Sequence, residues 1–384
     1  MPIPCALYIH VPWCVKKCPY CDFNSYTHDG PLPEAAYLEA LVADLDAALP
    51  LVAERSLPSV FIGGGTPSLL SAAGVRQLLT EIRARAQLAA DVEITLEANP
   101  GTLSEMLDES RLAGLRAAGV NRLSLGVQSF QDACLAALGR IHDRAAALRA
   151  VALAQRHFEC VNLDLMYGLP GQRDVAAALA DLETALDFAP RHVSCYQLTL
   201  EPNTRFAAFP PAGLPDPDLA ADMGDAIEAR LTAAGYAHYE ISAYAKPGGA
   251  CRHNLNYWRF GDYLGIGAGA HGKLTVSRPG HAPRVLRQAR PRHPEAYLRQ
   301  AGAPFPVFEV LPREVPFEFL MNALRLTSGF SPRLFAARTG QSLADTLPRL
   351  RAAERAGLLR VAPTRILPTP RGRRFLNRLL EMLM

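Results

Sequence analysis

Short apolar stretches alternate with longer segments rich in alanine and leucine through the first half of this chain. The short stretches, rich in β-branched and aromatic residues, predict strands over residues 7–11, 59–62, 93–97, 122–126, 160–166 and 192–198. The longer segments predict helices over residues 34–49, 72–86, 104–118, 131–138, 145–158 and 176–188. Such alternation is typical of an α/β fold with parallel strands and crossover helices. Six repeats predict a partial (β/α)6 barrel of the TIM type, in which ligands gather at the C-terminal strand ends.

The pattern changes in the second half. Residues 209–217 are rich in proline and residues 277–294 in proline and arginine, so both are predicted to be loops. Helices are expected over residues 315–327, 331–339 and 343–356, followed by a small hairpin of residues 357–361 and 365–367 and a final helix. Three helices and a hairpin predict a small, winged-helix-like domain. The expected division is a barrel of residues 1–240, a connecting segment of residues 241–306 and a C-terminal domain of residues 307–384.

Charge and composition point to no nucleic-acid or membrane partner. The 384 residues carry a formal net charge of +3, which is too weakly basic to predict either. No apolar run reaches membrane-spanning length, and the first residues resemble neither a secretion signal nor a matrix-targeting peptide. Near the C-terminus, Arg371, Arg373, Arg374 and Arg378 are better explained as a solvated helix face than as a DNA-binding surface.

Three cysteines in a short N-terminal loop carry the strongest chemical signal. Cys14, Cys18 and Cys21 are spaced C-x3-C-x2-C, and three thiolates can hold three corners of a cubane iron–sulfur cluster while the fourth iron stays open to a small molecule. Structural zinc is the alternative, but it usually requires four ligands, and only His10 and His28 lie near in sequence. A cluster requires reduced thiols, which predicts the cytoplasm.

Glycine and polar residues follow the predicted strands. The run Gly63-Gly64-Gly65-Thr66-Pro67 would let a ligand approach backbone N–H groups, although a plain barrel turn is the favoured interpretation of this run taken alone.

Two carboxylates and an amide occupy the next strands. Glu97 could accept both hydroxyls of a ribose, and an N-cap or a salt bridge at the barrel rim is the alternative. Gln128 ends the fourth strand. Asp164 lies among apolar residues of the fifth strand, where an unpaired carboxylate would be costly, so it should face a partner or a ligand.

Together these motifs resemble the radical S-adenosylmethionine superfamily, and more closely its coproporphyrinogen oxidase-like branch. The resemblance begins at Tyr8 and extends into the C-terminal domain. It implies a [4Fe–4S] cluster on Cys14, Cys18 and Cys21, with S-adenosylmethionine on the fourth iron. Reduction would then give a 5′-deoxyadenosyl radical, while the protein supplies binding, orientation and exclusion of solvent. The cofactor contacts that the resemblance implies are Tyr8, Tyr20, Gly64, Gly65, Thr66, Glu97, Gln128, Arg140 and Asp164.

Two members of this branch differ just after the cluster loop. Oxygen-independent coproporphyrinogen III oxidases carry a further cysteine where this chain has Phe23, together with an N-terminal extension ahead of the first strand. Both differences match the HemW-type heme chaperones, in which Asp-Phe follows the cluster motif. This resemblance implies binding of heme and its delivery to apoproteins such as those of the respiratory chain. The alternatives are a porphyrinogen oxidase that decarboxylates propionate side chains and a zinc-stabilised binding protein.

A second motif supports the HemW-type resemblance. His253-Asn254-Leu255-Asn256-Tyr257-Trp258 matches an H-N-x-x-Y-W signature that is linked in these proteins to heme binding. The imidazole of His253 could ligate or hydrogen-bond a porphyrin, and the two aromatic side chains offer flat faces. The alternative is a structural motif that joins the barrel to the rest of the chain.

Other candidate residues have ordinary explanations. His271 follows the glycine-rich residues 265–269, which would allow close approach to a ligand, but a tight turn with a hydrogen-bonded histidine is the favoured interpretation. Cys134, Cys160 and Cys195 are expected to be small core residues.

Overall fold

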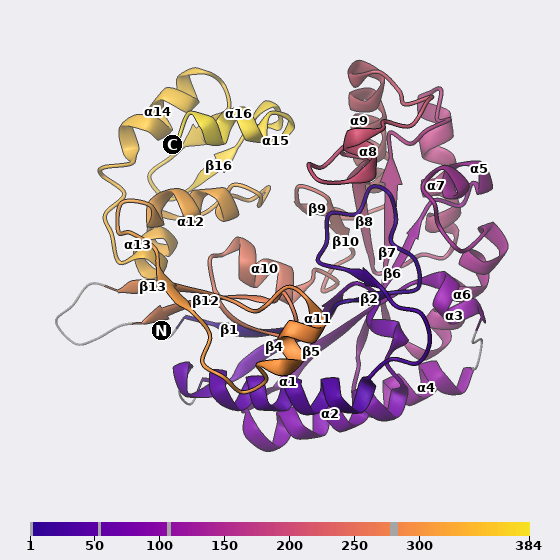
Figure 1. Ribbon diagram of the computed structural model, residues 1–384. Helices are drawn as coiled ribbons and strands as arrows, with labels where there is room; N and C mark the ends of the chain where they lie inside the picture. Colours follow the sequence, from indigo (N-terminus) through magenta and orange to yellow (C-terminus); the bar gives the residue numbers. More distant parts are fainter. Residues whose placement is uncertain (1–2, 53–54, 106–108, 277–282) are drawn as a thin grey trace.

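A partial barrel forms the centre of the computed structural model, which describes residues 3–52, 55–105, 109–276 and 283–384. All six predicted strands are confirmed, and they pair in parallel in chain order: β1 (Cys5–Val11), β4 (Leu57–Gly64), β5 (Leu88–Ala98), β6 (Arg122–Gln128), β7 (Cys160–Tyr167) and β8 (His192–Gln197). The barrel stays open, because the first and last of these strands pair with further strands and not with each other. The curved sheet with its outer helices can be followed in Figure 1.

Additional strands extend both edges of this parallel sheet. Next to β8 lie the antiparallel strands β10 (Ala243–Ala245) and β9 (Ala237–Glu240). Next to β1 lies the parallel strand β11 (Asp262–Ile266), followed by antiparallel β12 (His271–Val276), β13 (Arg284–Ala289) and β14 (Val307–Glu309). The sheet therefore has 12 strands, in the order β14-β13-β12-β11-β1-β4-β5-β6-β7-β8-β10-β9.

The segment of residues 241–306 is therefore part of the main sheet, where a connection was expected. The predicted loop over residues 277–294 was wrong over β13, while its residues 277–282 lie outside the described residues. In β13 two arginines, Arg284 and Arg287, stand among few apolar residues, and their partners Glu309 and Glu318 come from later elements. The sequence of β13 alone therefore lacked the apolar alternation that predicts a strand.

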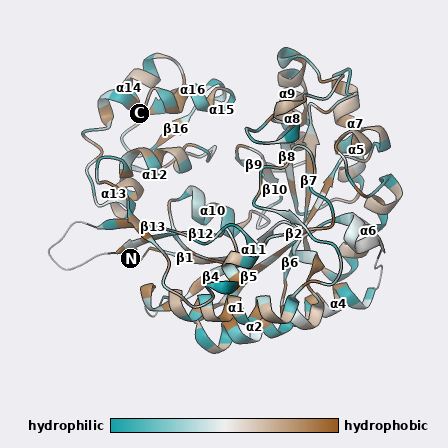
Figure 2. Ribbon diagram, in the orientation of Figure 1, coloured by the Kyte–Doolittle hydropathy of each residue, from teal (hydrophilic) through white to brown (hydrophobic). Residues whose placement is uncertain are grey.

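Helices cover the outer side of the sheet (Figure 1). They are α1 (Glu34–Ala48), α2 (Ala72–Arg85), α3 (Pro100–Glu105), α4 (Glu109–Ala118), α5 (Asp132–Ala137), α6 (Arg144–His157), α7 (Val175–Asp187) and α9 (Pro217–Ala233). The helix predicted over residues 104–118 corresponds to parts of α3 and α4, and residues 106–108 of that prediction lie outside the described residues. Hydrophilic and hydrophobic bands alternate along the outer helices (Figure 2), as expected of helices with one face on a sheet. In the described ranges, no helix is long and apolar enough to cross a membrane.

The C-terminal domain has the predicted three helices and hairpin. Its elements are α12 (Val315–Ala323), α13 (Pro332–Thr339), α14 (Leu347–Arg355), β15 (Leu359–Val361), β16 (Ile366–Pro368), α15 (Pro370–Arg374) and α16 (Leu376–Glu381). Two of its basic residues contact the barrel, because Arg373 pairs with Glu228 and Arg374 with Asp225, both on α9. These arginines are therefore held by acidic partners of the same chain.

A buried ion pair joins the start of the chain to the far edge of the sheet. Asp44 on α1 is inaccessible to solvent and lies 2.8 Å from Arg290, which follows β13. The Tyr297 hydroxyl (3.0 Å) and the Gly267 N–H (3.1 Å) also donate to this carboxylate. Three donors from one distant segment thus satisfy a single buried charge, as burial requires.

We expect the variant Asp44→Ala to lower the free energy of unfolding by about 3–5 kcal/mol, because it leaves the Arg290 guanidinium buried without its partner. Urea denaturation followed by circular dichroism measures the change. Asp46→Ala on the same helix is the control, since the Asp46 carboxylate is exposed in its pair with Arg85 and its loss should change stability little. Equal effects of the two variants would contradict the assigned importance of the buried pair.

Candidate functional site

The loop that carries three cysteines begins directly after β1. The short strands β2 (Trp13–Cys14) and β3 (Tyr26–Thr27) pair in parallel and hold the two ends of the loop together. Within the loop, the Cys21 N–H donates to the Cys18 carbonyl at 3.1 Å, forming a tight turn. Cys14, Cys18 and Cys21 all line one cavity of about 370 Å³ at the C-terminal ends of the parallel strands. We call it the cluster cavity.

The surroundings of the three cysteines are compatible with a cluster in which each thiolate binds its own iron. Among the residues that the structure describes, no three His, Cys, Asp or Glu side chains converge on a position for one metal ion. A cubane has a different requirement, since each thiolate binds its own iron. Cys14 Sγ accepts a hydrogen bond from Thr66 Oγ1 (3.4 Å), and Cys18 Sγ lies 3.5 Å from Arg140 Nη1. Burial raises the pKa of the Cys14 and Cys21 thiols, so metal binding has to displace their protons.

The glycine run at the end of β4 packs directly on the chain that leads into the cysteine loop. Gly64 has a φ of +119°, and a Cβ there would lie 2.6 Å from the His10 ring. A Cβ on Gly65 would lie 2.6 Å from the Trp13 carbonyl oxygen. The Thr66 N–H donates to that same oxygen at 2.8 Å. Only glycine allows this close approach, so the run is needed for packing against His10 and Trp13 and is not simply a turn.

Glu97 ends β5 inside the cluster cavity. Its Oε2 accepts the Gly64 N–H at 3.0 Å, so the carboxyl also fixes the glycine run. Burial raises the pKa of Glu97 to about 8, the bond from Gly64 opposes that rise, and the nearby Asp164 adds to it. The carboxyl therefore changes its protonation close to neutral pH.

A bulge at the end of β6 turns Gln128 toward the cavity. The pairing of β6 with β7 shifts between Gly126 and Gln128, and Gln128 has a φ of +69°. A Cβ on Gly126 would lie 3.0 Å from Gln128 Nε2, so this glycine makes room for the amide. Arg140 donates from Nη2 to the Gly126 carbonyl at 2.8 Å. Its buried Nε has no hydrogen-bond partner in the described part of the chain, and it offers a donor to an anionic ligand group.

Asp164 on β7 is held by three neighbouring side chains. Asn162 Nδ2 (2.8 Å) and Ser124 Oγ (2.9 Å) donate to its carboxylate, and the Tyr196 hydroxyl lies 3.4 Å away. Burial raises the pKa of Asp164, and these hydrogen bonds oppose the rise. Ser124 on β6 and Tyr196 on β8 were not predicted from the sequence to be site residues, although both strands were predicted.

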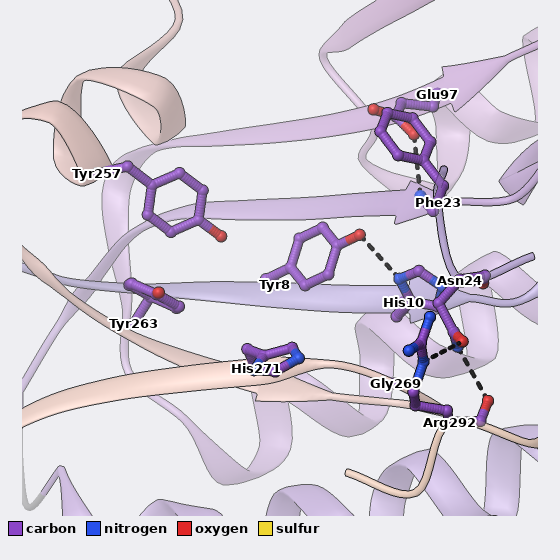
Figure 3. Close-up of a pocket in the computed structure, with 11 residues that line it drawn as sticks. Tyr8, His10, Phe23, Asn24, Glu97, Tyr257, Tyr263, Gly269, His271 and Arg292 are labelled. Carbon is purple, nitrogen blue, oxygen red and sulfur yellow. Dashed lines mark hydrogen bonds between the residues drawn. The ribbon is translucent and has the colours of Figure 1, made fainter. Parts of the chain in front are cut away.

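A second cavity of about 590 Å³ adjoins the first, and we call it the aromatic cavity (Figure 3). Its walls include Tyr8 from β1, Tyr257 and Tyr263. Tyr257 comes from α10 (Arg252–Trp258) and meets the Tyr263 ring edge-on, with ring centres 4.5 Å apart. Phe23, Gly64 and Glu97 line both cavities and form the shared wall. Of the residues implied as cofactor contacts, Tyr8 lies in the aromatic cavity, whereas Tyr20, Gly65, Thr66, Gln128, Arg140 and Asp164 line the cluster cavity.

His253 lies behind the wall of the aromatic cavity. Its side chain is 1% exposed, and both ring nitrogens have partners, Ser59 Oγ at 3.1 Å and the Tyr257 hydroxyl at 3.0 Å. Burial lowers its pKa to about 3, so the ring is neutral. The structure therefore does not place His253 on the lining of either cavity, where the sequence motif led us to expect it.

Asn24 connects the cysteine loop to the second half of the chain, a role that no local pattern in the sequence predicts. Its Nδ2 donates to the carbonyl oxygens of Ala268 (3.1 Å) and Arg292 (2.9 Å). Its own carbonyl lies 2.8 Å from His10 Nε2, and His10 Nδ1 lies 3.0 Å from the Tyr8 hydroxyl. These contacts join β1, the cysteine loop and the turn after β11.

Comparison with known proteins identifies relatives over the whole chain. The model of the radical SAM superfamily matches residues 8–182, and that of the HemN C-terminal domain matches residues 310–375. The chain is 48% identical to the heme chaperone HemW of Escherichia coli K12, covering 99% of this chain and 98% of the relative. It is 45% identical to the heme chaperone HemW of Haemophilus influenzae, covering 99% and 97%.

A mitochondrial protein and a solved structure are also similar. Radical S-adenosyl methionine domain-containing protein 1 of Bos taurus is 45% identical over 73% of this chain and 63% of its own length. The structure of coproporphyrinogen III oxidase (HemN) from Escherichia coli matches with a TM-score of 0.81 and 24% identity, over 100% of this chain and 90% of that chain. This last likeness confirms the predicted fold.

We expect Glu97→Gln to change how stability depends on pH. With a folded-state pKa of about 8 against an ordinary 4.5, the carboxyl contributes stability that is complete below about pH 4.5 and is lost as the pH rises toward 8. The amide cannot ionise, so the variant should gain stability relative to the original protein between about pH 5 and about pH 8. Urea unfolding of the cluster-free proteins measures this difference. The exposed Glu39→Gln is the control, and a Glu97→Gln variant that follows the original protein at every pH would show that the pKa is ordinary.

Proposed function

This chain belongs to the HemW family of the radical S-adenosylmethionine superfamily, and from that premise we propose that it is a heme chaperone. It binds heme and delivers it to apoproteins, including those of the respiratory chain. The observation that carries the proposal is the identity of 48% to a HemW protein along 99% of this chain. The aromatic cavity next to the cluster cavity supports it, because flat aromatic walls suit a macrocycle.

The family implies a [4Fe–4S] cluster and S-adenosylmethionine, which together supply one-electron cleavage of a carbon–sulfur bond when bound. In our proposal Cys14, Cys18 and Cys21 hold the cluster. Glu97 accepts the ribose hydroxyls, and Arg140 offers its buried Nε to the methionyl carboxylate. The remaining contacts of S-adenosylmethionine are Tyr8, Tyr20, Gly64, Gly65, Thr66, Gln128 and Asp164, of which Tyr8 reaches it from the side of the aromatic cavity.

His253 also keeps a place in the proposed heme site. Its imidazole holds the hydroxyl of Tyr257, which lines the aromatic cavity, so it supports that wall from behind. In this proposal the H-N-x-x-Y-W signature contributes to the heme site through Tyr257, whose hydroxyl is positioned by His253.

Phe23 supports the chaperone over the oxidase. It stands where the oxidases carry an additional cysteine, and its exposed ring forms part of the wall between the two cavities. Reducing conditions such as those of the cytoplasm fit the eight cysteines, all of which are free.

Cluster assembly under anaerobic conditions tests the role of the cysteine loop. With iron and sulfide, the protein should turn brown and contain about four irons per chain. We expect Cys14→Ala to lose most of this iron, because a thiolate ligand is missing, whereas Cys134→Ala should keep it, since Cys134 lies on α5 and does not line the cluster cavity. Iron analysis and visible absorption measure both variants. Tightly bound zinc in place of iron would contradict the proposal.

Heme transfer and porphyrinogen turnover together test the function. We expect the cluster-loaded protein to bind heme saturably and to pass it to a heme-free respiratory b-type cytochrome, measured by the Soret bands of donor and acceptor. With coproporphyrinogen III, a reductant and S-adenosylmethionine, the same preparation should form no sustained protoporphyrinogen. Sustained formation would overturn the chaperone in favour of the oxidase.

A further inference from the structure

We propose that the aromatic cavity is the heme site and that His271, on its lining, supplies the axial ligand to the heme iron. The inference rests on the proposed heme chaperone function and assigns that function to particular residues. His271 opens β12, directly after the glycine-rich turn, and its ring lies in the cavity beneath Tyr8 (Figure 3).

The shape and lining of the aromatic cavity suit a flat macrocycle. Its volume of about 590 Å³ lies within the range of about 300–1,000 Å³ that is usual for small-molecule pockets. Tyr8, Tyr257 and Tyr263 present aromatic rings from three different elements. Such rings provide broad apolar contact area for a planar ligand.

The hydrogen-bond partners of the nearby histidines show which imidazole is available to bind heme iron. Both ring nitrogens of His10 are engaged, by the Tyr8 hydroxyl at 3.0 Å and the Asn24 carbonyl at 2.8 Å. His253 is engaged in the same way, by Ser59 and Tyr257. In the described part of the chain, no hydrogen bond holds the ring of His271, and its residue is exposed at the cavity. A neutral imidazole with a free nitrogen is the usual protein ligand of heme iron.

Arg292 supplies a cation for the propionate groups of heme. It lines the same cavity, and its Nε donates to Asn24 Oδ1 at 3.3 Å, which holds the side chain beside Asn24 (Figure 3). A guanidinium has five donors, so the Nη groups remain for a carboxylate. The apolar walls, the imidazole and the cation thus belong to one cavity.

The exposure of this site suits a cargo that has to leave. His271 and Arg292 are both exposed, whereas Tyr257 on the inner wall is fixed by its bond to the buried His253. The shared wall of Phe23, Gly64 and Glu97 places heme next to the cluster cavity. The bound heme would therefore be in reach of both an acceptor protein and the cofactors.

Heme titration of the cluster-loaded protein, read by difference absorption and resonance Raman spectra, tests the ligand. His271→Ala should weaken heme binding at least about tenfold, as loss of a metal-site partner does, and should lose the spectral signature of a histidine ligand. Added imidazole should restore that signature, because it can enter the vacated space. His157→Ala, on α6 and outside both cavities, is the control, and His253→Ala should keep the histidine signature.

Esterified heme tests the cation. We expect heme dimethyl ester to bind the original protein more weakly than heme does, and Arg292→Ala to bind the two equally.

If the original protein binds heme and His271→Ala keeps both affinity and spectrum, His271 is not the ligand and this inference fails while the chaperone proposal stands. If the original protein binds no heme, the chaperone proposal itself fails. Binding of S-adenosylmethionine that displaces heme competitively, with no effect of Arg292→Ala on the ester, would assign the aromatic cavity to a nucleoside.

Discussion

The close packing of the glycine run at the end of β4 on the end of β1 and on β2 is the contact on which the rest of the site depends. Gly64 and Gly65 leave no room for a Cβ, since the His10 ring and the Trp13 carbonyl would each lie within 2.6 Å of it. This approach brings Thr66 to the thiol of Cys14 and the Gly64 N–H to Glu97. The packing of these two glycines therefore positions both the start of the cysteine loop and the wall between the two cavities.

The charged side chains around the cavities are half-buried, and each is stabilised in a different way. Asp164 is held by donors from β6, β7 and β8, so its position is fixed before any ligand binds. Glu97 has one backbone donor, and burial keeps its pKa high. Arg140 has an Nε without a partner within the described residues. Asp164 therefore belongs to a preformed wall, whereas Glu97 and Arg140 keep hydrogen-bonding capacity that a ligand would fill.

The first and second halves of the chain are joined where the aromatic cavity forms. Asn24 bonds to the turn after β11, and Asp44 bonds to Arg290 beyond β13. The additional strands next to β1 thereby become a wall of the site. The C-terminal domain is held both by arginines on α15 that pair with α9 and by Arg287 on β13, which pairs with Glu318 on α12.

Local patterns in the sequence determined the six parallel strands and the cysteine loop, because strand periodicity and a ligand motif are both written within short stretches of chain. The sequence also placed the polar side chains of Gln128 and Asp164 on predicted parallel strands, and both line the cluster cavity. The strand β13 and the role of Asn24 could not be predicted, since their partners lie far along the chain.

The histidines show the same division most clearly. The sequence placed an imidazole at His253 and another at His271, and by local pattern the first was the stronger candidate. Only the tertiary structure decided which ring is available, because Ser59 from β4 and Tyr257 occupy both nitrogens of His253 while His271 faces the cavity. Hydrogen-bond saturation depends on residues that the fold brings together, and no spacing along the chain records it.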